Sequence, residues 1–203
     1  MNIHDFSKKF ILNDKIKNID SYLGLRLSEF LREEENLKGT KVGCNAGDCG
    51  SCTVLIDNEA CCSCLTTLAK VQNKKVETIE GIKKSELFAK LKDSFSYYGA
   101  AQCGICTPGM LMASVALLRK KNNPSVKEVE EALSGVLCRC TGYRKILQAV
   151  SNVNKRFKKE VSIETTNAVG KRLERLDGKE KIEGTDIFGD DYYPKNSLIA
   201  KII

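Results

Sequence analysis

Cysteine is the residue type in this chain whose number and spacing could do chemistry. The 203-residue sequence contains ten cysteines, and eight of them fall into two sets of four. The first set is Cys44, Cys49, Cys52 and Cys64. The second set is made of two tight pairs, Cys103 with Cys106 and Cys138 with Cys140. Thiolates bind zinc and iron–sulfur clusters well, so each set is a candidate metal centre.

The first set has the spacing Cys-x4-Cys-x2-Cys with a distant fourth cysteine, which is typical of plant-type [2Fe–2S] ferredoxins. Three thiolates on one irregular loop must approach a compact cluster from different directions. Gly43, Gly47 and Gly50 allow the backbone to turn its N–H groups toward the sulfur atoms. Structural zinc sites more often combine two pairs with about two to four residues inside each pair, so this spacing favours iron. We expect Cys64 on the strand that follows the loop.

The second set comes together only if the starts of two helices meet. Cys103 and Cys106 lie just before Thr107-Pro108, where proline indicates a helix start. Cys138 and Cys140 precede another expected helix. The N-terminal ends of helices carry partial positive charge and would stabilise an anionic cluster. On spacing alone zinc remains an alternative, because Cys-x2-Cys is common to both metals.

Cys61 and Cys62 are interpreted as ordinary thiols on the strand before Cys64, with Cys62 a minor alternative ligand because residues two apart on a strand face the same side. Residues 1–10 are polar and mixed, so no secretion signal is expected. No apolar run is long enough to span a bilayer, and no membrane association is expected. The expected location is therefore the reducing cytoplasm, where metal ligation is favoured over disulfides.

Residues 8–80 predict a small α+β domain. Asn13-Asp14 and Asp57-Asn58 are typical of tight hairpin turns. A short amphipathic helix is expected around residues 27–31. The expected strands lie at residues 9–12, 15–19, 53–56, 60–63 and 75–79.

Residues 85–157 predict a bundle of four helices. Ser85 is placed to cap the first, and Ser125 with Glu128 predicts a capping box for the third. Proline is expected at the first position of the second helix. The fourth helix is expected to carry one apolar face formed by Ile146, Leu147, Val150, Val153 and Phe157. Beyond it, residues 160–168 are expected to be a linker, and residues 197–203 to be the opening strand of another domain.

The formal charge of +7 would fall to roughly +3 if two oxidised [2Fe–2S] clusters were bound. The basic run of Lys155, Arg156, Lys158 and Lys159 is interpreted as a solvated helix end, and no nucleic acid is expected as a partner. His4 is expected at the surface. It is the one histidine in the sequence, and the lack of others disfavours Rieske ligation, which needs two.

Several segments closely resemble the iron–sulfur subunit of molybdenum hydroxylases, the family that contains xanthine dehydrogenase and aldehyde oxidoreductase. These segments are "LREEENLKGTKVGCNAGDCGSCTVLIDNE", "TIEGI", "GAAQCGICTPGM" and "SGVLCRCTGYRKILQAV". The resemblance implies a ferredoxin-like β-grasp [2Fe–2S] domain at residues 1–82 and an all-α four-helix-bundle [2Fe–2S] domain at residues 83–157. Residues 158–203 would then be a linker and an N-terminal fragment of the molybdenum-binding domain.

The resemblance also implies cofactors and partners. Each cysteine set would hold one [2Fe–2S] cluster, with molybdopterin next to the helical cluster and the usual acceptor, FAD, beyond the other, both on partner domains or subunits. Gln102 matches a glutamine that hydrogen-bonds the pterin, and Cys140 matches the ligand nearest to it. A plain helix-capping amide is the alternative for Gln102.

The segment "VGKRLERLDGKEKIEGTDIFGDD" resembles the start of the family's molybdenum-binding subunit. It lacks the usual proline before the arginine region, and its matching positions are Arg175, Asp177, Lys181, Gly184 and Asp190. This match implies that the small module is fused to the molybdenum subunit with no flavin domain between them. The later regions that would hold molybdopterin or substrate lie outside these residues.

The sequence therefore predicts the electron-transfer component of a xanthine dehydrogenase-like oxidoreductase, which passes electrons from molybdopterin through two clusters to FAD or another acceptor. It has no catalytic residue of its own, because substrate hydroxylation would occur at molybdenum. A stand-alone two-cluster ferredoxin is an alternative that Gln102 and the C-terminal segment disfavour. A zinc-binding interaction module is a weaker alternative.

Overall fold

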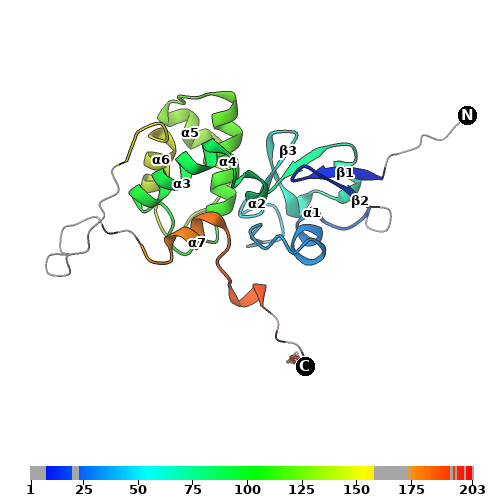
Figure 1. Ribbon diagram of the computed structural model, residues 1–203. Helices are drawn as coiled ribbons and strands as arrows, with labels where there is room; N and C mark the ends of the chain where they lie inside the picture. Colours follow the sequence, from blue (N-terminus) through cyan, green and yellow to red (C-terminus); the bar gives the residue numbers. More distant parts are fainter. Residues whose placement is uncertain are drawn as a thin grey trace, which may run out of the picture.

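The computed structural model contains one half built on a β-sheet and one half built on helices (Figure 1). His4, Lys158, Lys159, the predicted linker at residues 160–168 and the side chain of Asp190 lie outside the described residues. The structure describes residues 8–19, 23–157, 173, 175–192, 194, 196–198 and 200–202.

The first half is a five-stranded mixed sheet with the strand order β2-β1-β5-β3-β4. β1 pairs antiparallel with β2 and parallel with β5, whereas β3 pairs antiparallel with both β4 and β5. The fifth strand is shorter than predicted because residue 79 already begins the helix α2 (Ile79–Ile82). The strands are β1 (Lys9–Leu12), β2 (Lys15–Asn18), β3 (Thr53–Ile56), β4 (Glu59–Cys62) and β5 (Lys75–Glu77).

Both predicted hairpin turns are confirmed. Asn13 and Asp14 have φ values of 47° and 64°, and Asp57 and Asn58 have φ values of 50° and 69°. Two successive left-handed residues define the turn that matches the natural twist of paired strands. Asparagine and aspartate tolerate this conformation better than other non-glycine residues.

The sheet half has its own apolar core. It is closed by α1 (Leu27–Glu29), which continues into a π-helical turn, η1 (Phe30–Glu34). The Phe10 and Phe30 rings meet edge to face with centroids 5.9 Å apart. Strand β3 is buried on both faces: Val54 and Ile56 pack into this core, whereas Leu55 packs into the core of the helical half.

The second half contains α3 (Glu86–Tyr98), α4 (Thr107–Lys120), α5 (Val126–Leu133) and α6 (Arg144–Ser151). The Ser85 hydroxyl accepts the Phe88 N–H at 3.2 Å, and the capping box of Ser125 with Glu128 is formed as predicted. α4 begins at Thr107, so Pro108 follows the first helical position.

The fourth helix was expected to reach Phe157, but α6 ends at Ser151. The Ala149 carbonyl accepts the Ser94 hydroxyl at 2.6 Å, and the Val153 N–H bonds the Val150 carbonyl at 3.3 Å instead. The next hydrogen bond of the helix is therefore not made. Val153 is still buried, and Phe157 packs on the Tyr97 and Tyr98 rings.

The C-terminal segment contains two short elements that were not predicted, α7 (Gly178–Glu183) and the 3₁₀ turn η4 (Gly189–Asp191). Figure 1 shows α7 beside the helical half and η4 farther along the chain. The predicted opening strand is wrong for the described residues after 195, which are irregular. Leu198 and Ile202 are 97% and 99% exposed. None of the described strands pairs with their segment, so its backbone has no ladder to join.

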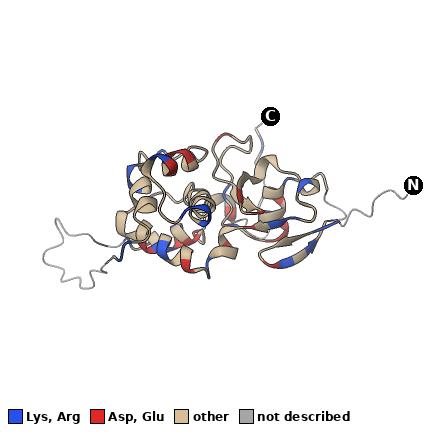
Figure 2. Cartoon of the chain, turned by 90° about the horizontal axis from the view of Figure 1, so that it is seen from above, with Lys and Arg blue, Asp and Glu red and all other residues tan. Residues whose placement is uncertain are grey.

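None of the described helices is both long and apolar enough to cross a membrane. Basic and acidic residues are interspersed over both halves of the molecule (Figure 2).

Candidate metal centres

Three cysteines of the first set lie on the loop between η1 and β3. The Cys44 sulfur accepts hydrogen bonds from the backbone N–H groups of Ala46 and Cys49, at 3.3 and 3.4 Å. The Cys49 sulfur lies 3.0 Å from the Ser51 hydroxyl. The loop therefore directs donors at its sulfur atoms, as an anionic centre requires.

The fourth cysteine of this set, Cys64, was expected on a strand. It lies instead in a 3₁₀ turn, η2 (Ser63–Leu65), directly after β4. The Ser63 hydroxyl donates a 2.7 Å hydrogen bond to the Cys52 carbonyl and so holds this turn against the ligand loop.

Glycines shape the first loop where a side chain could not fit. Gly47 and Gly50 have φ values of +85° and +67°, a region that L-residues avoid. A Cβ on Gly43 would lie 3.0 Å from the Cys49 sulfur. Gly47 and Gly50 therefore supply left-handed turns in the loop, whereas Gly43 leaves room for the Cys49 sulfur.

The thiols of the first set interact in two pairs. Backbone hydrogen bonds from Ala46 and Cys49 lower the pKa of Cys44 to about 7, and its side chain also interacts with that of Cys49. Burial raises the pKa of Cys64 to about 12, and a hydrogen bond with the Cys52 thiol adds to this rise. Cys44 is thus grouped with Cys49, and Cys52 with Cys64.

Cys62 is a fifth thiol beside this set. It ends β4, opposite Thr53 in the strand register. Burial raises its pKa, and the next contribution comes from the nearby Cys52 thiol. Cys61, the neighbouring residue, is half-buried and packs against the core of the sheet half.

The second set lies on two loops. Cys103 and Cys106 precede α4, with Cys106 as its N-cap residue, and Cys138 and Cys140 lie between α5 and α6. Burial raises the pKa of Cys103, and a hydrogen bond with the Cys140 thiol raises it further. Burial likewise raises the pKa of Cys106, followed by the interaction with Cys138. The bundle thus joins one cysteine of each loop to one of the other.

Exposure differs within the second set. Cys106 and Cys138 are buried, whereas Cys103 and Cys140 are exposed. Burial acts to raise the pKa of Cys138, but hydrogen bonds from Thr141 outweigh it and lower the pKa. Of the two exposed residues, Cys103 directly follows Gln102, and Cys140 is the ligand that the resemblance places nearest the pterin.

Tyr143 is a structural residue of this site that sequence reasoning missed. It has a φ of +65° directly before α6, which is rare for a bulky residue. Its hydroxyl accepts the Cys138 N–H at 3.0 Å, and its own N–H donates to the Thr141 hydroxyl at 3.1 Å. Tyr143 therefore holds together the two ends of the short loop between Cys138 and α6. The adjacent Thr-Gly is the one local signal of this turn.

The chemistry of both sets fits a [2Fe–2S] cluster. A [2Fe–2S] cluster needs two thiolates on each iron, and both sets present two interacting pairs. Thiols with N–H and O–H donors directed at sulfur fit this cluster.

The two ligand sets are joined by direct backbone contact. The Leu137 N–H, one residue before Cys138, donates a 2.8 Å hydrogen bond to the Cys49 carbonyl. A Cβ on Gly50 would lie 2.0 Å from the Gly135 carbonyl oxygen, and one on Gly109 would lie 2.6 Å from the Gly50 oxygen. Glycines therefore permit the two cluster loops to touch.

Gln102 directly precedes the exposed Cys103. Its backbone carbonyl accepts a 2.7 Å hydrogen bond from Arg175. The residue also lines a surface hollow of about 280 Å³ together with Lys145 and Arg175. The side chain is therefore at a surface where a partner could reach it.

Two family models match almost the whole described part of the two halves. The 2Fe-2S iron-sulfur cluster binding domain matches residues 10–79, and the [2Fe-2S] binding domain matches residues 78–151. Their order agrees with the sheet half followed by the helical half.

Curated relatives include separate small subunits. "Nicotine 6-hydroxylase small subunit" of Paenarthrobacter nicotinovorans is 44% identical over 124 residues, which cover 61% of this chain and 74% of the relative. "Xanthine dehydrogenase iron-sulfur-binding subunit" of Escherichia coli O157:H7 is 42% identical over 134 residues, which cover 65% of this chain and 84% of the relative.

A solved structure, the aldehyde oxidoreductase from Desulfovibrio desulfuricans, matches with a TM-score of 0.82 and 30% identity. This match covers 94% of the present chain and 23% of that chain, so the present chain spans about a quarter of its length. Both cluster domains and their order agree with these relatives. The chain belongs to the family of [2Fe–2S] iron–sulfur subunits of molybdenum hydroxylases of the xanthine dehydrogenase and aldehyde oxidoreductase type.

Proposed function

We propose that this chain carries electrons from a molybdopterin centre on a partner through two [2Fe–2S] clusters to FAD or another acceptor. The observation that carries the proposal is the direct backbone contact between two separate sets of four thiols. When bound, each cluster takes up and releases one electron. As a family member the chain is an electron-transfer component of an oxidoreductase, and we assign no substrate chemistry to its own residues.

We propose Cys44, Cys49, Cys52 and Cys64 as the ligands of the first cluster, and Cys103, Cys106, Cys138 and Cys140 as those of the second. Within each set, the interacting thiol pairs are the proposed ligands of one iron. Donors at the first site are the Ala46 and Cys49 amides, and the Thr141 hydroxyl lies 3.2 Å from the Cys138 sulfur at the second. Such groups raise the potential of a bound cluster by stabilising negative charge on sulfur.

The hydrogen bond from Leu137 to Cys49 supports electron passage between the two sites. It joins Leu137, the residue before the proposed ligand Cys138, to the proposed ligand Cys49 at 2.8 Å. The glycines on both sides remove the side chains that would otherwise separate the loops. The chain thereby holds its two sites in direct main-chain contact.

We propose Gln102 and Cys140 as the contacts to the pterin on the partner. Gln102 adjoins a hollow at the surface, and Cys140 is exposed. The Arg175 hydrogen bond fixes the Gln102 backbone carbonyl and leaves the amide side chain available. A cap role for Gln102 has less support, because the N-cap residue of α4 is Cys106.

The wider assignment follows from these sites. We propose domains at residues 1–82 and 83–157, followed by a linker and the start of a molybdenum-binding domain at residues 158–203. We further propose a cytoplasmic enzyme that hydroxylates a carbon of an aldehyde or N-heterocycle, with a xanthine dehydrogenase-like substrate as the first to test. A flavin subunit is the proposed acceptor, and no membrane or nucleic acid is proposed as a partner.

Iron, zinc and acid-labile sulfide assays on anaerobically purified chain test the proposal. About four iron and four sulfide per chain are expected, with visible absorbance and two EPR signals after reduction. A colourless, zinc-loaded chain would support the interaction-module alternative instead. Two clusters that are never reduced by a substrate-reduced molybdenum partner would support the stand-alone ferredoxin.

A further inference from the structure

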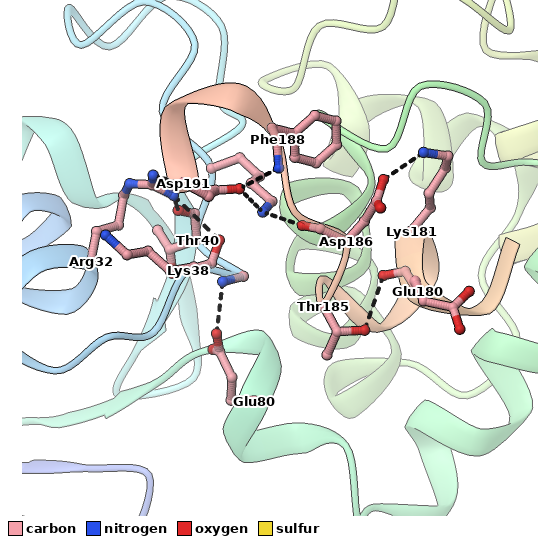
Figure 3. A network of polar contacts seen from close by, with 12 residues as sticks. Arg32, Lys38, Thr40, Glu80, Glu180, Lys181, Thr185, Asp186, Phe188 and Asp191 are labelled. Carbon is pink, nitrogen blue, oxygen red and sulfur yellow. Dashed lines mark hydrogen bonds and ion pairs between the residues drawn. The ribbon is translucent and has the colours of Figure 1, made fainter. Parts of the chain in front are cut away.

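A buried ion cluster joins the C-terminal segment to the sheet half (Figure 3). The Asp191 carboxylate accepts hydrogen bonds from Arg32 at 2.6 Å and from Lys41 at 3.1 Å. The side chains of Arg32, Lys41 and Asp191 are 8%, 4% and 5% exposed. Ions are seldom buried to this extent unless they are paired, so this contact is specific.

The two cations are prearranged by the sheet half itself. The Arg32 Nη1 donates to the Thr40 carbonyl at 2.9 Å and to the Lys38 carbonyl at 3.3 Å, which directs Nη2 at Asp191. The loop that carries Lys41 is held by a 2.8 Å hydrogen bond from the Gly39 N–H to the Glu80 carboxylate. Two neighbouring cations repel each other, so this arrangement favours an anion between them.

The segment is shaped to fit this site. Asp191 also accepts the Phe188 N–H at 3.0 Å, which closes η4 around the carboxylate. Lys41 lies 4.8 Å from the centroid of the Phe188 ring and donates to the Asp186 carbonyl at 3.2 Å. The Lys41 ammonium thus contacts a carboxylate, a carbonyl and an aromatic face of one segment.

The same segment also binds the helical half. Ile182 is 2% exposed within the helical core, and Glu183 pairs with Lys92 at 3.2 Å. A Cβ on Gly184 would lie 3.2 Å from the Gly39 Cα and 3.4 Å from Pro108. The segment therefore crosses from one cluster half to the other at close backbone contact.

We propose that Arg32 and Lys41 form a carboxylate-receiving site that docks the segment leading into the molybdenum-binding domain, with Asp191 as its occupant. Docking fixes residues 175–191 across both cluster halves and so sets where the next domain begins. The identity of that domain rests on the proposed function, whereas the docking itself does not. The match to aldehyde oxidoreductase covers 94% of this chain and therefore includes this segment. The matches to the separate small subunits cover only 61% and 65% of this chain.

Hydrogen exchange of the full chain, measured by mass spectrometry on peptides spanning residues 182–191, tests the docking. Asp191→Asn should accelerate exchange there by about tenfold or more, because it leaves two buried cations without a counter-charge. The matched control is Asp177→Asn on the same segment, where the carboxylate is 48% exposed; a change below about twofold is expected.

A second substitution separates docking from general destabilisation. Lys41→Met in the Asp191→Asn background removes one unpaired cation, so exchange should slow relative to Asp191→Asn alone. If Asp191→Asn does not fold, Lys41→Met alone provides the comparison, with faster exchange than Asp177→Asn expected. Equal exchange in wild type and in the Asp191→Asn or Lys41→Met variant would overturn the proposal. Iron content, measured in parallel, reports separately on the proposed function.

Discussion

The two cluster sites of this chain are assembled by different means. The first site takes three proposed ligands from one loop, and that loop supplies its own amide donors to sulfur. The second site takes two from each of two loops, which only the packing of α4, α5 and α6 brings together. The first is therefore largely a local structure, whereas the second depends on the tertiary fold.

The sites also differ in exposure. In the first set Cys52 and Cys64 are buried and the other two are half-buried, whereas in the second set Cys103 and Cys140 are exposed. The exposed pair includes Cys103, which follows Gln102, and suits direct contact with the proposed pterin partner. The first site has no exposed cysteine, so electrons would leave it for the proposed acceptor through the surrounding ligand loop.

Removing one ligand from each site should produce the largest effect and shows whether the sites are independent. Cys138→Ser should lower iron from about four to about two per chain, since serine is a poorer ligand for the soft iron–sulfur core. The EPR signal of the first cluster should persist. Cys52→Ser should do the converse. Loss of both signals from either substitution would show that the sites do not assemble separately.

The contact between the sites can be broken at Gly50. In Gly50→Ala the new Cβ would lie 2.0 Å from the Gly135 oxygen at a φ of +67°, so we expect a loss of about 3 kcal/mol or more in the free energy of unfolding. Electron exchange between the clusters should slow as well. Chemical denaturation and rapid-mixing reduction measure the two effects.

Gly142→Ala is the control for this change. Gly142 has a φ of +58°, but nothing lies within 4 Å of its added Cβ. We therefore expect only the backbone cost of about 1 kcal/mol and no change in electron exchange. Equal losses at Gly50 and Gly142 would mean that the loop contact is unimportant for stability.

The cap of α5 tests how far the second site depends on helix packing, because α5 leads into the Cys138 loop. Ser125→Ala should lower the free energy of unfolding by about 1 kcal/mol and leave the first cluster unchanged. The measurement is thermal unfolding followed at both clusters. A lowered melting temperature seen only at the first cluster would contradict the dependence of the second site on helix packing.

The same cap has a defined pH dependence. Hydrogen bonds from Lys121 and then Ser125 lower the pKa of Glu128 to about 2. Because the folded value is depressed, this stabilisation is complete above the unfolded value of about 4.3 and is lost as pH falls through about 2. The difference in melting temperature between wild type and Glu128→Gln should therefore stay constant from about pH 8 to about pH 5.

The smallest effect is expected at the fifth thiol of the first site. Cys62→Ser should leave iron content and both EPR signals unchanged, because the ligand loop directs the Gly47 N–H at the thiol of Cys64. The corresponding control is Cys64→Ser, which should lose the first cluster. Retention of that cluster in Cys64→Ser and its loss in the double variant would identify Cys62 as a substitute ligand.

Much of the sheet half was predictable because its determinants are local. The hairpin turns were readable from Asn13-Asp14 and Asp57-Asn58, and the first ligand loop was readable from cysteine spacing and glycines. The position of Cys64 was not, because a 3₁₀ turn after β4 depends on the hydrogen bond between Ser63 and Cys52. The length of α6 was also missed, because its Ala149 carbonyl bonds the Ser94 hydroxyl, which lies 55 residues away in the chain.

The sequence by itself determined that two sets of four thiols exist, where two tight turns and two helix caps lie, and which family the chain resembles, since these are matters of residue type and spacing. The tertiary structure decided which thiols pair across loops, that Gly50 and Gly135 meet, and that Asp191 reaches Arg32 across 159 residues. Contacts between residues far apart in sequence depend on packing and burial, and no local pattern records them.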